Sequence, residues 1–252
     1  VDEERVGTEY ESEWEKSGEY GRRAMQCGEN LTKLLYYFGI SSPLDVVWSH
    51  ATNSKIKLER ALAPGSRVMI LEADVSWGSC GNLRETSIMA HPPHRKSDIA
   101  FTDFCRRVCK HNRDVEPSRR VGVKFDFKDG RCVEPCLTIL RELAGTEETV
   151  GWPVFLNADV WMGPGGNPPK ILPSDFFAAC FDIYPAGTLS PGWTCWLQFD
   201  GPSEAASRLL DPMLLEGYNL QHVEDALRTL PRGVGHVTFP VHCTMARVGS
   251  EA

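Results

Sequence analysis

Residues 67–78 read RVMILEADVSWG, an apolar run typical of a buried β-strand that nevertheless carries two acids, Glu72 and Asp74. Side chains alternate between the two faces of a strand, so both acids share one face and the opposite face is apolar. The apolar face consists of Met69, Leu71, Ala73 and Val75. Because burial of an unpaired carboxylate costs several kcal/mol, the acidic face needs cationic partners or a metal ion. The run therefore predicts a strand with helices on one face and a polar site on the other.

Two later runs, VGVKFDF and PVFLNADV, repeat this alternation of an apolar and a polar face. The polar face of the first run carries Lys124 and Asp126, and Lys128 follows on the same face. The polar face of the second run carries Asn157 and Asp159. In a parallel sheet, these side chains meet the acids of the opening run at one end of the strands.

Two shorter runs, DVVWSH and SIMAH, end on the histidines His50 and His91. With them, five successive strands bring charged or titratable side chains to the carboxyl end of the predicted sheet. In (β/α) barrels this end of the strands is where active sites are built. The pattern therefore favours a functional site over an isolated structural ion pair.

Strand-like runs alternate along the chain with segments of helical pattern, which predicts an α/β fold of mostly parallel strands. The strand-like runs are residues 45–50, 68–75, 87–91, 121–127, 153–160, 187–193 and 236–241. The helical segments are residues 9–38, 97–110 with Ser97 as the cap, 133–145, 173–184 and 219–230. At this length, and without a G-x-G-x-x-G motif, a TIM-like (β/α) barrel is favoured over a dinucleotide-binding sheet.

Seven strand-like runs are one fewer than a closed barrel needs, so the eighth strand is either irregular or lies beyond Ala252. The predicted organisation is an N-terminal helical segment, residues 1–40, packed on a barrel domain of residues 41–252.

The predicted polar surface combines four acids with two lysines, which leaves two negative charges, the charge that one divalent cation neutralises. The acids are Glu72, Asp74, Asp126 and Asp159, and the lysines are Lys124 and Lys128. Carboxylate oxygens favour a hard cation, Mg²⁺ or Ca²⁺, over zinc. Two histidines beside such a cation suit acid and base chemistry on a phosphoryl centre, with a lysine on its anionic oxygens.

Each of these assignments has a structural alternative. The paired acids can form a salt-bridged layer with the two lysines that needs no metal. Asn157 and Asp159 either contact substrate or support the ligands and anchor a loop. Trp193 is a candidate substrate contact, with a place in the core or the pocket wall as its alternative.

Composition excludes some classes of partner and leaves the compartment open. A net charge of −7 argues against nucleic acid, whose binding needs clustered Lys and Arg. No apolar stretch approaches the roughly 18 residues of a membrane span, and the charged N-terminal residues do not resemble a signal peptide. Nine cysteines are compatible with buried thiols or with disulfides, so both an extracellular and a cytoplasmic location fit. No pattern indicates a protein partner.

Seven motifs occur in the order and spacing of the menorin-like proteins, a family related to the phospholipase-C-like phosphodiesterase barrels. They are WSHATNS, ILEADV, IMAHPP, GVKFDFK, FLNADVWMGPGGN, TLSPGWT and VTFPV, and the resemblance covers about residues 44–248. The wider superfamily, which includes glycerophosphodiester phosphodiesterases, uses a TIM-like barrel, one divalent metal and two histidines. The resemblance therefore implies a phosphodiester small molecule or a lipid headgroup as the substrate.

The resemblance also implies roles for individual residues. The E-x-D motif gives Glu72 and Asp74 as metal ligands, and D-x-K gives Asp126 as the third ligand with Lys128 on the phosphate. His50 and His91 match the two catalytic histidines, which protonate the leaving group and assist the nucleophile.

This sequence also departs from the pattern of the wider superfamily. His50 precedes Ala51 where glycerophosphodiesterases have arginine, so a phosphate contact is missing or comes from Lys124. His91 precedes Pro92 where the superfamily usually has aspartate. Menorin-like proteins are known more for developmental roles than for a defined substrate. A non-catalytic binding or adhesion protein that retains the site is therefore the alternative to an enzyme, and a Schiff-base lyase using Lys124 or Lys128 is a more remote one.

Overall fold

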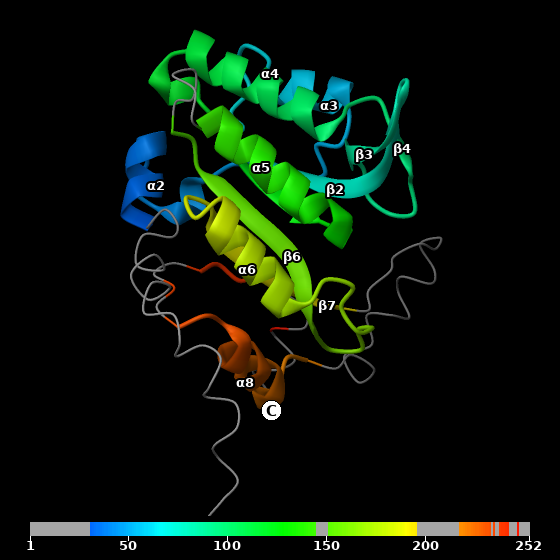
Figure 1. Cartoon of the computed structure of the whole chain (residues 1–252). Coiled ribbons are helices and arrows are strands. Elements are labelled where there is room, and N and C mark those ends of the chain that lie inside the picture. The colour runs from blue at the N-terminus through cyan, green and yellow to red at the C-terminus, as the bar shows by residue number, and fades with distance from the viewer. Residues whose placement is uncertain are drawn as a thin grey trace, which may run out of the picture.

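The structure, a computed structural model, describes residues 31–144, 151–195, 217–232, 234, 237–241 and 246. Its centre is a mostly parallel sheet that forms half of a barrel, with the strand order β1-β2-β5-β6-β7 (Figure 1). These strands are β1 Trp48–Ser49, β2 Ile70–Cys80, β5 Gly122–Phe127, β6 Val154–Met162 and β7 Thr188–Thr194. Within the described residues, β7 does not pair back with β1, so the predicted α/β parallel sheet is confirmed while the closed barrel stays a prediction.

Three helices cover one face of the half-barrel and connect its parallel strands (Figure 1). They are α4 Phe101–Asp114, α5 Val133–Ala144 and α6 Pro173–Ile183. The strand residues packed against them belong to the apolar sets that parity predicted and are buried in one core; the exception is Met69, which is half-buried and packs with Ile70 and Phe155. This set comprises Leu71, Ala73, Val75, Val123, Phe125, Phe127, Val154, Leu156, Ala158 and Val160. The prediction of a helix-covered apolar face is therefore confirmed.

A smaller apolar cluster lies on the opposite face, toward the amino ends of the strands. Phe38, at the end of helix α2 (Leu31–Phe38), packs there with Ile70 and Phe155. The chain therefore places an apolar layer below the polar end of the half-barrel. Only residues 31–38 of the predicted 9–38 helix are described, and residues 1–30 lie outside the described part of the chain.

The SIMAH run was predicted to be a parallel barrel strand, and that prediction is wrong. Strand β3 (Leu83–Met89) pairs antiparallel with the distal half of β2. The reversal comes directly after Cys80, where Gly81 adopts a φ of 57°, a left-handed conformation that glycine tolerates without strain. The carboxyl end of β3 nevertheless returns to the acids, because the Ala90 amide donates to the Asp74 carbonyl oxygen at 3.0 Å.

The predicted Ser97 cap is also wrong. Ser97 belongs to the short strand β4 (Lys96–Ser97), and its hydroxyl donates to the Met89 carbonyl oxygen at 2.8 Å. Helix α4 begins only after Ala100, which makes no side-chain cap.

Several short elements complete the described structure. Helix α3 (Lys55–Ala61) was not predicted, whereas α8 (Leu220–Thr229) was, and the structure shows that Asn219 caps it. The 236–241 run contributes a single parallel bridge between Val237 and Leu189 instead of a strand. The 3-10 turns are η1 Pro43–Asp45, η2 Pro117–Arg119 and η3 Gly130–Cys132.

Four cysteines of the described segments are buried in the core, namely Cys105, Cys132, Cys136 and Cys180. Burial is the main reason that the pKa of the Cys105 thiol lies well above its ordinary value. In the same segments, no helix is both long enough and apolar enough to cross a membrane.

The core on β2 gives a stability prediction. Leu71 is fully buried in the central strand, whereas Leu44 is 93% exposed in η1. We expect Leu71→Ala to lower the free energy of unfolding by about 2 to 5 kcal/mol, because it removes buried contacts and leaves a cavity. The matched Leu44→Ala should change it by less than about 0.5 kcal/mol. Urea denaturation measures both, and equal effects would contradict this placement of β2.

Candidate functional site

Three acids converge where β5 ends, beside the part of β2 that pairs with it. The two strands pair in parallel with Asp74 opposite Asp126 and Glu72 opposite Lys124. One carboxylate oxygen from each of Glu72, Asp74 and Asp126 lies within 4.8 Å of the other two. All three residues are buried, with at most 8% of their surface exposed. We call these residues the acid triad.

A pocket of about 320 Å³ opens beside the acid triad. Its lining combines most of the polar residues that the sequence analysis selected with an indole and a proline. The lining residues are Trp48, His50, Glu72, Lys124, Asp126, Asn157, Asp159 and Pro240. The alternation of faces along β2, β5 and β6 therefore predicted correctly which polar side chains lie on the face away from the helices.

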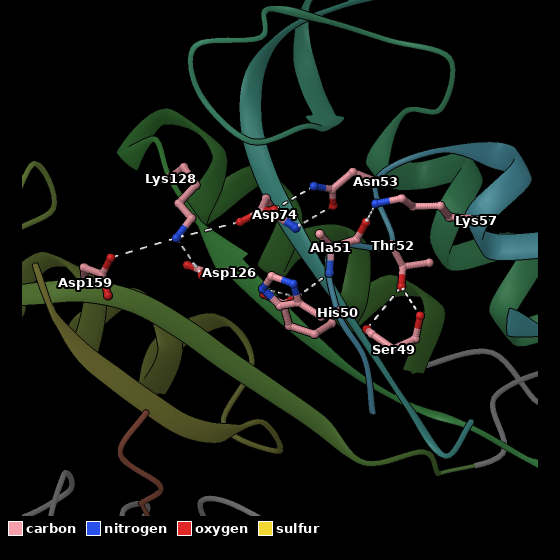
Figure 2. A network of polar contacts seen from close by, with 11 residues as sticks. Ser49, His50, Ala51, Thr52, Asn53, Lys57, Asp74, Asp126, Lys128 and Asp159 are labelled. Atoms are coloured by element: carbon pink, nitrogen blue, oxygen red, sulfur yellow. Dashed lines mark hydrogen bonds and ion pairs between the residues drawn. The ribbon is translucent and has the colours of Figure 1, made fainter. Parts of the chain in front are cut away.

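The loop after β1 holds two of the acids in place (Figure 2). The Ala51 amide donates to Glu72 Oε2 at 2.7 Å. The Asn53 amide nitrogen donates to Asp74 Oδ2 at 2.6 Å, and Asn53 Oδ1 accepts from the Asp74 backbone amide at 2.9 Å. Neither partner was predicted from the sequence. The available signal was that buried carboxylates need hydrogen-bond donors, and a short polar segment directly follows the predicted strand.

Lys128 supplies the positive charge at the centre of the site (Figure 2). Its ammonium lies 2.7 Å from Asp126 Oδ2, 3.7 Å from Asp74 Oδ1 and 3.9 Å from Asp159 Oδ2. Burial alone would lower the pKa of Lys128, but the surrounding carboxylates outweigh it and raise that pKa. The amine is therefore held in its charged form, which opposes the Schiff-base alternative for this residue.

The environment also changes the pKa of two carboxyl groups. Burial is the largest effect on Glu72 and raises its pKa, although the hydrogen bond from the Ala51 amide opposes it. Burial likewise raises the pKa of Asp159 to about 6, against the influence of Lys128. Asp159 has room in the pocket because Gly192 stands opposite it on β7, where a Cβ would lie 2.8 Å from Asp159 Oδ1.

Two polar atoms of the site are buried without a hydrogen-bond partner among the described residues. They are Asp126 Oδ1, an acceptor, and Asn157 Nδ2, a donor. Asp126 and Asn157 are paired neighbours on β5 and β6. Buried groups of this kind are uncommon, because each costs about 1 to 3 kcal/mol when unpaired. The acceptor fits a cation and the donor fits an anionic oxygen, so the donor set suits a hard cation with an anionic ligand.

The two histidines differ in their relation to the acid triad. His50 Nε2 lies 3.7 Å from Glu72 Oε2, and its side chain is 88% exposed at the pocket. His91 follows Ala90 and is exposed, and its Nδ1 lies 2.6 Å from the Pro92 carbonyl oxygen. Among the described residues His91 has no hydrogen bond or ion pair with the acid triad. The structure thus brings His50 to the pocket, whereas His91 is not among the residues that line it.

Trp193 lies in an aromatic cluster and does not line the pocket. Its ring centroid is 5.0 Å from that of Trp161 and 5.7 Å from that of Phe239. Its indole nitrogen donates to the His222 carbonyl oxygen at 3.4 Å. Trp48 is the indole that borders the pocket.

Together, the fold and the site define an α/β half-barrel protein with an acid-lined pocket at the carboxyl ends of its strands. Residues 43–251 match the family model described as the Menorin N-terminal domain, and the chain belongs to the menorin family. Human Protein FAM151B is a relative, 30% identical over 203 residues. That alignment covers 81% of this chain and 64% of the relative, so the chain spans less than two thirds of that protein. No solved structure matches this chain significantly.

The link between Asn53 and Asp74 gives a second stability prediction. Asn53→Ala removes a hydrogen bond to a buried carboxylate and leaves the Asp74 backbone amide unpaired. We expect the free energy of unfolding to fall by about 2 kcal/mol or more, because hydrogen bonds to charged groups contribute more than neutral ones. As a control, Gln221→Ala removes an exposed bond to Asp225 and should cost less than about 0.5 kcal/mol. An Asn53→Ala effect as small as the control's would show that the loop does not hold Asp74.

Proposed function

We propose that this chain carries a divalent-metal-dependent phosphodiesterase-like site. We also propose that its half-barrel belongs to the TIM-like barrels of the phospholipase-C-like phosphodiesterases. The observation that most supports the metal is the acid triad, in which a buried oxygen of Asp126 lacks any hydrogen-bond donor among the described residues. Unpaired, that oxygen is costly, and a cation would satisfy it.

Glu72, Asp74 and Asp126 would hold one Mg²⁺ or Ca²⁺ ion, because their carboxylate oxygens are ligands of hard cations. The acid triad and Asp159 together outnumber Lys124 and Lys128 by two charges, which one such ion balances. When bound, the ion supplies Lewis-acid stabilisation of negative charge on a phosphoryl oxygen.

The chain's own residues would bind and orient the phosphodiester. The ammonium of Lys124 and the unpaired amide of Asn157 both face the pocket and can donate to anionic phosphoryl oxygens. Lys128 would stabilise the same charge from the floor of the site. A volume of about 320 Å³ suits a phosphodiester small molecule or a lipid headgroup.

His50 would transfer the proton that the reaction requires. In hydrolysis a water oxygen bonds to phosphorus and gives up a proton, while the bond to the leaving alcohol oxygen breaks and that oxygen takes up a proton. An imidazole can accept and donate protons at neutral pH, and His50 stands exposed at the pocket beside Glu72. His91 is the proposed second histidine, one residue beyond the backbone bond between Ala90 and Asp74.

A non-catalytic binding protein that retains this site is the second candidate. Two observations favour it: Lys128 already pairs with three of the acids, and the His91 ring is turned onto the Pro92 carbonyl group. In this alternative the pocket holds an anionic ligand without turning it over.

A substrate screen separates the two candidates. We expect the wild-type chain to cleave a glycerophosphodiester or a lysophospholipid in the presence of Mg²⁺ or Ca²⁺, and to lose that activity in EDTA. His50→Ala should lower kcat by about 10²- to 10⁴-fold, the usual effect of removing an acid or base. Asp126→Asn should lower it as well and also raise the metal concentration required.

His111→Ala is the matched control, because this histidine lies on α4 and its one side-chain hydrogen bond within the described part of the chain joins it to the Arg119 carbonyl oxygen, away from the pocket. It should retain full activity. If calorimetry shows that the chain binds a phosphodiester but no turnover is seen under any of these conditions, the non-catalytic candidate is favoured. That result would contradict the proposed enzymatic activity.

A further inference from the structure

The ammonium of Lys128 lies beside two of the three carboxylates that would hold a metal. Two of its three carboxylate partners, Asp126 at 2.7 Å and Asp74 at 3.7 Å, belong to the acid triad. The third, Asp159 at 3.9 Å, does not. Lys128 is therefore shared between the proposed metal ligands and one acid outside them.

A divalent cation and this ammonium compete for the same charge. Oxygen ligands lie about 2.0 to 2.6 Å from Mg²⁺ or Ca²⁺, so an ion held by Asp74 and Asp126 would stand close to the lysine nitrogen. Two cations at such a distance repel each other strongly in a partly buried site. Lys128 bonds Oδ2 of Asp126, whereas Oδ1 has no hydrogen-bond partner among the described residues, so an ion on Oδ1 would compete with the ammonium for the charge of this carboxylate and push the ammonium away.

We propose that Lys128 is an internal counter-ion of the acid triad and that Asp159 receives its ammonium when a divalent cation binds. The inference rests on the proposed function, because it assumes a cation held by Glu72, Asp74 and Asp126. In this proposal Asp159 is not a metal ligand, and its role is to position the Lys128 ammonium. The metal affinity then depends on how easily the ammonium moves from the acid triad to Asp159.

The geometry restricts the exchange to a movement of the lysine side chain. The Lys128 backbone amide donates to the Val75 carbonyl oxygen at 2.9 Å, which holds its main chain against β2. A shift of about 1 Å would turn the 3.9 Å contact with Asp159 into a normal charge-assisted hydrogen bond. Asp159 keeps its place because Gly192 leaves room for its carboxylate.

A double-mutant cycle on metal affinity tests the exchange. Titration calorimetry with Mg²⁺ and Ca²⁺ is carried out on the wild-type chain, Lys128→Met, Asp159→Asn and the double variant. We expect Lys128→Met to bind the ion at least about tenfold more tightly, because the competing cation is gone. Asp159→Asn should bind it about three- to tenfold more weakly, since Lys128 loses its second partner. In the Lys128→Met background, Asp159→Asn should change the affinity less than about twofold.

Lys124→Met is the matched control. It removes the same charge from the same strand end, but Lys124 lines the pocket and makes no ion pair with the acid triad among the described residues. Its effect on the affinity should stay below about threefold. If Lys124→Met and Lys128→Met change the metal affinity equally, the effect comes from the net charge of the site alone. That result would overturn the proposed exchange.

The remaining outcomes separate the exchange from the metal site itself. If the wild-type chain binds the ion and Lys128→Met binds it equally or more weakly, the exchange is overturned. The proposed metal site would still stand. Absence of binding by both proteins overturns both proposals. If Lys128→Met does not fold, Asp159→Asn still decides, because unchanged metal affinity in that variant contradicts the exchange.

Discussion

The in-register parallel pairing of β2 with β5 is the constraint on which the site depends. It sets Asp74 directly opposite Asp126 and keeps every second side chain of both strands on the face away from the helices. The opposite parity buries Leu71, Val75, Val123 and Phe125 in the core. A shift of one residue would exchange the two sets, so the hydrophobic core and the site are specified by the same register. The apolar core therefore keeps the acids together, although their mutual repulsion opposes it.

The rest of the site reduces the cost of that arrangement. The Ala51 amide and the Asn53 side chain donate to Glu72 and Asp74, and Lys128 contributes a charge to three carboxylates. One buried oxygen, Asp126 Oδ1, has no such partner among the described residues. The chain thus satisfies its buried acids incompletely, and the unsatisfied position coincides with the pocket that His50, Lys124 and Asn157 line. Local incompleteness of this kind is expected where a protein binds a ligand.

The sequence predicted the features that follow from period-two alternation. The polar faces of residues 68–75, 121–127 and 153–160, and the apolar faces behind them, appear in the structure as expected. Features that depend on chain reversal or on loop geometry were missed or wrong. SIMAH looked like one more barrel strand because its apolar character does not encode direction, while the decisive residue, Gly81, lies outside it. Asn53 was missed because its role arises only when the loop folds back on Asp74. Trp193 was left with two roles, a substrate contact or a core or wall position, because tryptophan suits both, and tertiary packing puts it against Trp161.

Anomalous scattering from crystals grown with Mn²⁺, a scatterer that can replace Mg²⁺ on oxygen ligands, tests the central claim most directly. We expect a single anomalous peak among the carboxylates of Glu72, Asp74 and Asp126, with the Lys128 nitrogen displaced toward Asp159. A peak elsewhere, or none at millimolar Mn²⁺ with Lys128 still on Asp126, would show that the acid triad is a salt-bridged structural layer and not a metal site.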